Sequence, residues 1–457
     1  MLDPRVATSA VDAFQTALDE RWSYRHANRA DFGGAITALR KRIEAGIGAD
    51  ELGIELQRIL ALGIDGHSGV SGYSLPRGGC LPFLVEAAGE RFVAFDPERR
   101  HFLGDGLPFL VKLDGRPVTD WCAAAAVLVS KGSPQYVRRR CLLQLRELDY
   151  WRERMELPKK ATVEVELADG SGKVRKVVTL PLAAAPLAAG PWPSGGSRVL
   201  EGNVGYLRLP TMVEATSVPE IRTWMPRFRD TAGLVVDVRD NNGGDRDALL
   251  LLYSYLAAPD DPPHVFTAAC YRLHPAHKED HLAGHHRMFR ADAPQWSERE
   301  RQAVAAFAKR FRPRWNPPAG QFSDWHYMAL SRLADPETYH YDKPVVVLMN
   351  GRCFSATDIF LAGLKGLMNV RLLGTPSAGG SAYTQDVPLG ATPLTLRIGS
   401  MASFQADGRL FDGNGIRPDV VVEPVPGYYI GARDNVLEEA MKRVVPLATG
   451  GARDHGP

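Results

Sequence analysis

Apolar residues recur at helical spacing along the first 64 positions of the chain. Steps of three and four residues put side chains on one face of a helix. The first such face consists of Val11, Phe14, Leu18 and Trp22. The pattern returns after position 36 and stops at the glycine-rich stretch 63–69. We therefore predict an N-terminal helical region over residues 1–70 that ends in a loop carrying His67.

The next segment, residues 71–190, changes to the β-branched and alternating pattern of strands. Strands are expected near 92–95, 109–113, 161–167 and 176–180, with a helical stretch over 119–155 between them. Residues 184–197 are rich in Ala, Pro and Gly, a composition typical of a linker. The segment is thus predicted to be a separate β-rich domain.

Strand and helix patterns alternate over residues 195–435. Strands are predicted at 204–209, 233–239, 344–349, 370–374, 394–398 and 420–422, and helices at 218–228, 246–257 and 356–368. Such alternation favours an α/β core. An insertion rich in His, Trp and Pro, residues 258–342, interrupts this core, and a C-terminal helix and tail, 436–457, follow it.

Length and composition narrow the functional classes. A chain of 457 residues has room for two or three domains, and 45% hydrophobic with 24% charged residues is typical of a soluble globular protein. A net charge of +2 predicts no nucleic-acid partner, and no apolar run approaches the ~20 residues of a membrane-spanning helix. Five widely spaced cysteines predict neither a disulfide framework nor a zinc site. With no visible secretory leader, a cytoplasmic location is expected, while export and oligomeric state stay open.

Ser355 stands where the apolar run 344–349 gives way to a helical pattern. A hydroxyl at that junction faces N–H groups without an intrahelical partner and the positive end of the helix dipole. It is either an ordinary helix N-cap or a nucleophile whose oxyanion the helix stabilises. Cys353 is a rival nucleophile, although a buried, inert thiol is the better interpretation.

Glycines mark the segment around Ser355 and three others, namely residues 65–69, 237–244 and 412–419. Taken together in this order, the four segments resemble the S41 serine peptidases, which include the tail-specific and C-terminal processing proteases and the tricorn core protease. The resemblance covers residues from about 200 to 425 and the His67 loop.

The resemblance implies a fold of α/β class, with a crotonase-like, ClpP-like protease core behind the N-terminal helical region. It also implies a PDZ-like domain ahead of that core. Residues 106–118 are similar to a PDZ strand followed by its turn, here Asp114-Gly115.

The resemblance also assigns roles to residues of the core. Ser355 is then the nucleophile, and oxyanion donors come from the N–H of Ala356 and an N–H of Gly243 or Gly244. Glycines suit this role physically, because no side chain covers their N–H groups. The loss of one such donor can cost ~3 kcal/mol of transition-state stabilisation.

The general base separates two branches of that family. Many bacterial relatives use a lysine, but Gly380 stands at its position here, so the chain resembles the tricorn-like branch with a histidine base. His67 matches that histidine, and an imidazole with a pKa near ~6.5 can accept a proton at neutral pH. Asp412 matches the acid that orients it, and Asp65 or Ser68 is the alternative.

Several other polar groups are predicted to be structural. Asp237 and Arg239 form a buried ion pair in this interpretation, and Asp358 suits the first turn of its helix. The insertion holds histidines at i, i+4 and i+8, a zinc-compatible spacing on a helix, namely His277, His281 and His285. No HExxH motif accompanies them, so a solvated segment is preferred. The tryptophans of the insertion are expected to pack on the core or line a groove.

A serine endopeptidase that acts on polypeptides, without metal or cofactor, is the first functional hypothesis. A catalytically inactive relative that binds a peptide or another ligand is the second, because the lysine position is empty. A metal-dependent hydrolase is the third. An esterase of the α/β-hydrolase class is disfavoured, since no GxSxG motif surrounds Ser355.

Overall fold

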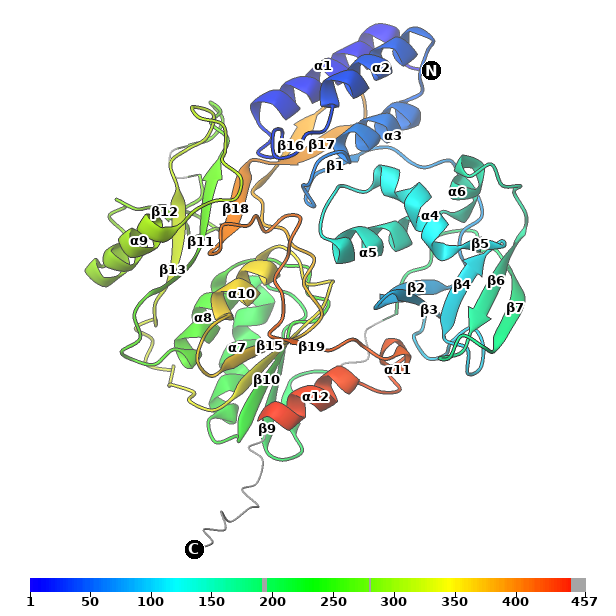
Figure 1. Cartoon of the computed structure of the whole chain (residues 1–457). Coiled ribbons are helices and arrows are strands. Elements are labelled where there is room, and N and C mark those ends of the chain that lie inside the picture. Colours follow the sequence, from blue (N-terminus) through cyan, green and yellow to red (C-terminus); the bar gives the residue numbers. More distant parts are fainter. Residues whose placement is uncertain (191–194, 279–280, 445–457) are drawn as a thin grey trace, which may run out of the picture.

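The computed structural model describes residues 1–190, 195–278 and 281–444 (Figure 1). Three helices open the chain: α1 (Pro4–Glu20), α2 (Phe32–Glu44) and α3 (Ala49–Leu60). Their apolar faces pack on a three-stranded antiparallel sheet of order β1-β17-β16, with β1 at Gly69–Ser71, β16 at Thr384–Pro388 and β17 at Thr395–Gly399. The N-terminal helices thus share a core with the C-terminal half of the chain.

A small antiparallel sheet of order β2-β3-β4-β6-β7 follows. Its strands are β2 (Leu84–Ala88), β3 (Arg91–Phe95), β4 (Phe109–Leu113), β6 (Thr162–Ala168) and β7 (Arg175–Pro181), and β5 (Arg116–Pro117) pairs with β4. The helical stretch expected over 119–155 consists of three helices, α4 (Val118–Ala125), α5 (Pro134–Gln144) and α6 (Leu148–Arg154), with a 3-10 turn at Ala126–Leu128. The stretch is divided where Ser133 caps α5 and Pro134 opens it.

The core holds a six-stranded sheet of order β19-β15-β14-β10-β9-β8. The strands are β8 (Arg198–Leu200), β9 (Val204–Arg208), β10 (Gly233–Asp237), β14 (Val345–Met349), β15 (Val370–Gly374) and β19 (Val420–Val421), and all neighbours except β8 and β9 are parallel. One face is covered by α7 (Glu214–Phe228), α8 (Asp247–Leu256) and α10 (Ala356–Leu364), and the other by α12 (Asn435–Val444). The predicted α/β alternation is confirmed.

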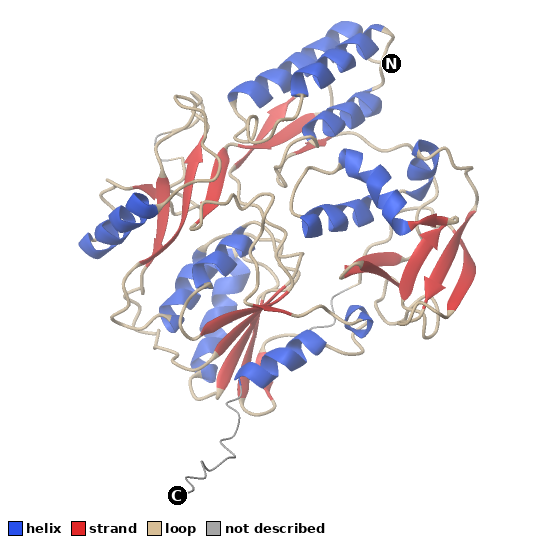
Figure 2. Cartoon of the chain, in the orientation of Figure 1, coloured by secondary structure: helices blue, strands red, loops and turns tan. Residues whose placement is uncertain are grey.

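The insertion forms most of a further sheet rather than a plain interruption, and a later strand completes that sheet (Figure 2). Its order is β12-β13-β11-β18, with β11 at His264–Tyr271, β12 at Phe289–Arg290, β13 at His326–Leu330 and β18 at Met401–Gln405. Helix α9 (Glu298–Arg310) packs against it. The insertion tryptophans contribute to the same apolar cluster as the N-terminal helices, as expected: Trp296, Trp315 and Trp325.

The end of the described chain carries α11 (Pro426–Tyr429) and α12. The predicted tail after residue 444 and part of the predicted linker, residues 191–194, lie outside the described residues. Among the described helices, none combines the length and the apolar character that crossing a bilayer requires.

Candidate active site

Ser355 occupies the bend between β14 and α10. Its φ of 61° and ψ of −124° lie in a region that non-glycine residues rarely adopt. The hydroxyl makes no N-cap hydrogen bond, so the ordinary capping interpretation is wrong. A Cβ placed on Gly243 would lie 2.7 Å from the Ser355 Cβ, which explains the glycine there. The bend holds the hydroxyl away from its own helix.

His67 meets this hydroxyl from the loop between α3 and β1. Its Nε2 lies 2.9 Å from the Ser355 Oγ, although 288 positions separate the two residues. The ring of Phe354 stacks on the imidazole with centroids 4.3 Å apart. Desolvation lowers the pKa of His67, while the charge of Asp65 opposes that shift. The imidazole is therefore neutral at pH 7, the form that can accept the serine proton.

Asp65 is one of two acids beside the imidazole. It accepts hydrogen bonds from the His67 backbone N–H at 2.9 Å, from the Trp22 indole at 2.9 Å and from the Gly399 N–H at 3.1 Å. The Ser68 hydroxyl donates to it as well. Asp65 and Ser68 thus fix the loop around His67 rather than its ring.

Asp412 is the second acid, and it is buried. It accepts from the Tyr24 hydroxyl at 2.8 Å, from the Ser381 N–H at 3.2 Å and from the Gly66 N–H at 3.3 Å. Burial, and next the charge of Asp65, raise the pKa of Asp412 to about 8. Its carboxyl is therefore mostly protonated in the resting site at pH 7.

The imidazole Nδ1 of His67 is buried, and no described residue bonds it. Ligand-type atoms of His67, Asp65 and Asp412 nevertheless lie within 4.8 Å of one another. A positive imidazolium would pull the pKa of Asp412 down again, because an opposite charge favours the carboxylate. Both acids can then stabilise a charged His67. A small rotation of the imidazole ring would give its Nδ1–H an acceptor.

The same three residues could be considered a metal site. Each carboxylate, however, accepts hydrogen bonds from several N–H and O–H donors, and His67 Nε2 faces the serine. Carboxylates that are surrounded by hydrogen-bond donors are better suited to stabilising an imidazolium than to binding a metal cation. The donor set therefore fits a proton-transfer site.

Trp22 and Tyr24 are site residues that the sequence interpretation missed. Both are fully buried, and each donates to one of the two acids from the segment that follows α1. Ser23 between them donates to the backbone carbonyls of Gly399 and Met401. No local signal could have identified them, since the Tyr24 hydroxyl and its acceptor are 388 positions apart.

The predicted oxyanion donors need one correction. The Gly243 N–H donates to the side-chain oxygen of Asn241 at 2.9 Å, so it is already engaged. Asn241 is itself held by the Thr357 hydroxyl at 2.7 Å. Ala356 is the first residue of α10, where an N–H has no intrahelical acceptor. Gly244 and Ala356 are the remaining candidates for oxyanion donors. Gly243 contributes through its lack of a side chain, which leaves room for Ser355.

Gly380 lies beside the stacked rings of Phe354 and His67. A Cβ on it would come within 2.4 Å of the Phe354 ring and 3.1 Å of His67 Cε1. The stacked pair of Phe354 and His67 therefore fills the space that a longer side chain would need. The absence of a side chain at position 380 and the placement of the histidine are parts of one packing arrangement.

Other predicted groups lie near the site without reaching the serine. Cys353 is buried, its thiol contacts the Val238 carbonyl at 3.1 Å, and burial raises its pKa, so it is an inert thiol as predicted. Asp237 and Arg239 form the predicted buried ion pair, with a separation of 2.6 Å. Asp358 is buried and accepts from Ser377.

The histidines of the insertion are not on a helix, and most are not solvated. His277 stacks on His281 with centroids 4.3 Å apart, and His281 lies 4.1 Å from the Tyr383 ring. Burial, and next the charge of Arg246, lower the pKa of His286 to about 3. Among the described histidines between residues 274 and 286, only His285, whose side chain is 87% exposed, fits the solvated segment that was expected. That expectation was wrong because these rings pack against β18 and its neighbours.

Comparison with known proteins now identifies the core. Residues 203–422 match the model of peptidase family S41. The chain is related to the S41 peptidases. The carboxy-terminal-processing protease of Bartonella bacilliformis is 35% identical over 91 residues, which are 20% of this chain and 21% of that protein. The match thus spans about a fifth of the length of this curated relative.

Solved structures show the same fold over almost the whole chain. Mature CPAF in complex with lactacystin has a TM-score of 0.67 and 16% identity, covering 96% of this chain and 99% of that one. Mature CPAF alone has a TM-score of 0.65 and 16% identity, covering 96% and 98%. At this identity the likeness concerns the mixed α/β fold. The S41 relationship predicted from four short segments is confirmed.

Proposed function

We propose that the chain is a serine peptidase that cleaves peptide bonds through an acyl-enzyme. The observation that supports this most is the 2.9 Å separation of His67 Nε2 and Ser355 Oγ, at a serine held in a strained backbone conformation. The S41 match over the core supports a polypeptide as the substrate.

In the proposed reaction, His67 Nε2 accepts the Ser355 hydroxyl proton while Oγ attacks the carbonyl carbon of the scissile bond. The tetrahedral oxyanion receives hydrogen bonds from the N–H groups of Gly244 and Ala356. The imidazolium then returns its proton to the leaving amine, and the C–N bond breaks. Water repeats the sequence on the acyl-enzyme with the same base and releases Ser355.

Asp412 is the proposed orienting acid. It takes up charge as His67 becomes positive, and Asp65 holds the loop on the other side of the ring. This division of roles, with Gly380 in place of a lysine, supports the tricorn-like branch of the S41 peptidases. The ring of Phe354, which fills the space beside Gly380, is part of the same argument.

The domain organisation is proposed as first predicted: helical region 1–70, PDZ-like domain 71–190, protease core 195–435 with its insertion 258–342, and C-terminal helix and tail 436–457. Support for the PDZ-like part comes from its antiparallel sheet, its flanking helices and the Asp114-Gly115 turn between β4 and β5.

An inactive ligand-binding relative and a metal-dependent hydrolase are the competing functions. The hydrogen-bonding geometry of His67 and Ser355 disfavours the first, because a protein that only binds a ligand does not need an imidazole beside a serine in a strained backbone conformation. The hydrogen-bond donors around Asp65 and Asp412 disfavour the second.

The test uses an unfolded protein substrate and a fluorophosphonate probe. Wild type is expected to release new peptide fragments, seen by mass spectrometry, and to carry the probe on Ser355. Ser355→Ala should lose both, and Ser71→Ala, which changes an exposed serine of strand β1, should keep both. Fragments that persist in Ser355→Ala and disappear with chelator would favour a metal-dependent hydrolase. Folded protein with neither fragments nor adduct would favour the ligand-binding relative.

A further inference from the structure

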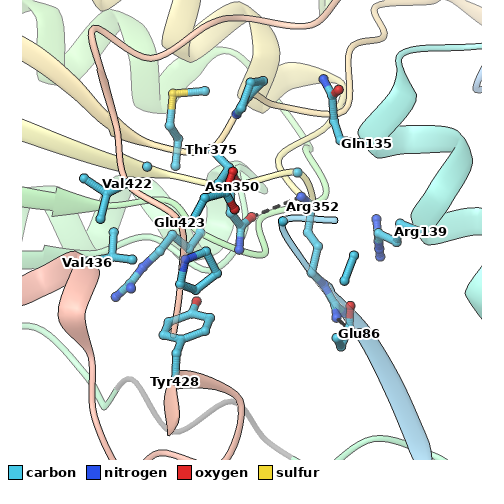
Figure 3. A pocket seen from close by; sticks show the side chains of 18 of the residues that line it. Glu86, Gln135, Arg139, Asn350, Arg352, Thr375, Val422, Glu423, Tyr428 and Val436 are labelled. Atoms are coloured by element: carbon cyan, nitrogen blue, oxygen red, sulfur yellow. Dashed lines mark hydrogen bonds and ion pairs between the residues drawn. The ribbon is translucent and has the colours of Figure 1, made fainter. Parts of the chain in front are cut away.

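The loops around the catalytic residues are contacted by two parts of the chain that lie outside the core sheet. One of them is α5, whose Gln135 lines a cavity together with Asn350 and Thr375 of the core loops (Figure 3). The other is a short segment of the insertion, residues 285–287. Unlike α5, this segment joins the loop of the candidate oxyanion donor to the loop that holds Asp412.

Residues 285–287 lie against residues 245–247, which directly follow the candidate oxyanion donor Gly244. The backbone is fixed there on the other side as well, because the Asp245 N–H donates to the Met212 carbonyl at 2.9 Å. Each residue of the insertion segment contacts its counterpart in 245–247. The His285 Nδ1 lies 4.0 Å from the Asp245 carboxylate, the His286 carbonyl accepts from the Arg246 guanidinium, and Arg287 pairs with Asp247.

The same segment holds the loop that leads to the orienting acid. The Nε2–H of His286 donates to the Ala382 carbonyl at 3.1 Å, and its ring lies 5.1 Å from the ring of Tyr383. The residue before Ala382 is Ser381, whose N–H donates to Asp412 at 3.2 Å. His286 therefore connects two loops that approach the catalytic residues from different parts of the chain.

Arg246 is an unusual residue for the interior of a protein. It is 4% exposed, no carboxylate of the described residues pairs with it, and burial lowers its pKa to about 9. Its Nη1, which donates to the His286 carbonyl, also lies 3.6 Å from the sulfur of Met328. A buried cation without an anion costs free energy, and an apolar side chain of similar length would be more stable in such a place. Stability therefore does not explain this arginine, whereas its bond to the insertion segment gives it a role.

We propose that Arg246 and His286 are positioning residues of the proposed peptidase, on which this inference rests. Joined through the insertion segment, they hold the oxyanion donor Gly244 in a fixed place relative to Asp412. They act through the two loops rather than on the scissile bond. A misplacement of about 1 Å in such a site can cost 100-fold in rate, so the loss of either bond lowers turnover more than substrate affinity.

Steady-state cleavage of an unfolded protein gives kcat and KM for matched variants. Arg246→Met and His286→Leu roughly keep side-chain size and remove the hydrogen-bond donor, so kcat should fall about tenfold or more with KM nearly unchanged. Arg246→Lys and His286→Gln restore a donor and should recover part of kcat. The same changes at exposed positions, Arg140→Met and His340→Leu, should leave both constants at wild-type values. Wild-type kcat in Arg246→Met and His286→Leu would overturn the proposal.

Urea unfolding and hydrogen exchange separate positioning from a purely structural role. Arg246→Met should unfold at no lower urea concentration than wild type, because it removes an unpaired buried charge. The amides of Asp245 and Ser381 should nevertheless exchange faster in this variant, since their loops are no longer joined. Lower stability together with an unchanged kcat per folded molecule would overturn the proposal and make Arg246 a structural residue.

A variant at the protein surface keeps the test available if a buried substitution prevents folding. Arg287→Gln removes the ion pair with Asp247, in which the arginine side chain is 47% exposed, and should also speed exchange of the same two amides. Unchanged exchange in Arg287→Gln and in the folded buried variants would refute the positioning role whether or not the protein cleaves peptides. Faster exchange in a wild-type background that shows no cleavage would instead refute the proposed peptidase function.

Discussion

The buried carboxyl of Asp412 makes stability depend on pH in a way that one substitution can isolate. Its pKa is about 8 in the folded protein, against an ordinary value of 3.8, because burial and the charge of Asp65 disfavour the carboxylate. Between these values the folded protein keeps a proton that the unfolded chain has lost. The contribution of this group to the free energy of unfolding is therefore largest below pH 4, and it is lost as pH rises toward 8.

The magnitude follows from the linkage. One pKa unit corresponds to about 1.4 kcal/mol, so the rise from pH 5 to pH 8.5 removes roughly 4 kcal/mol of stability through this group. In Asp412→Asn the amide oxygen can still accept from Tyr24 and Ser381, but its NH2 faces the Gly66 N–H, at a cost of about 1 kcal/mol. The variant should lie within about 1 kcal/mol of wild type at pH 5 and be about 4–5 kcal/mol more stable than wild type at pH 8.5, with catalysis impaired.

The assay is urea unfolding at both pH values, followed by tryptophan fluorescence and circular dichroism. The difference in unfolding free energy between variant and wild type cancels the other titrating groups. Asp105→Asn, an exposed acid of the small β domain, is the control and should show a difference that does not change with pH. A difference for Asp412→Asn that changes by less than about 1 kcal/mol between the two pH values would refute the reasoning.

Three further substitutions probe the packing around the site and the core. Tyr24→Phe removes a 2.8 Å hydrogen bond to the orienting acid, so kcat should fall about tenfold in steady-state assays with KM nearly unchanged. Gly380→Ala should push the stacked phenylalanine off the imidazole and slow probe labelling about 100-fold, while circular dichroism stays native. Arg239→Met should cost about 3–5 kcal/mol in urea unfolding, because the buried Asp237 loses its 2.6 Å partner; a loss under 1 kcal/mol would contradict this.

Much of the core was predictable because its signals are local. The strand before Ser355 is an unbroken β-branched run, and glycines mark each loop of the site, so single windows of sequence identified them. Helical spacing likewise predicted the N-terminal helices. The meeting of His67 and Ser355 was different, since only a family resemblance joined two segments 288 positions apart.

What could not be predicted depends on partners far away in the chain. Trp22 and Tyr24 look like helix-face and loop aromatics until Asp65 and Asp412 are placed beside them. The insertion forms strands because β11 pairs with β18, which lies more than 100 residues later. The Gly243 N–H is occupied because a side-chain oxygen two residues earlier turns back to it, a contact that no hydrophobic pattern encodes.

The rate of fluorophosphonate labelling of Ser355 across pH, in wild type and in His67→Ala, tests the central claim most directly. The pKa of the imidazole is lowered by burial, so the wild-type rate should reach its plateau with an apparent pKa below 6.5. Removal of the base should lower the plateau at least about 100-fold and abolish that ionisation. Labelling of His67→Ala at the wild-type rate, with the same pH profile, would contradict the account.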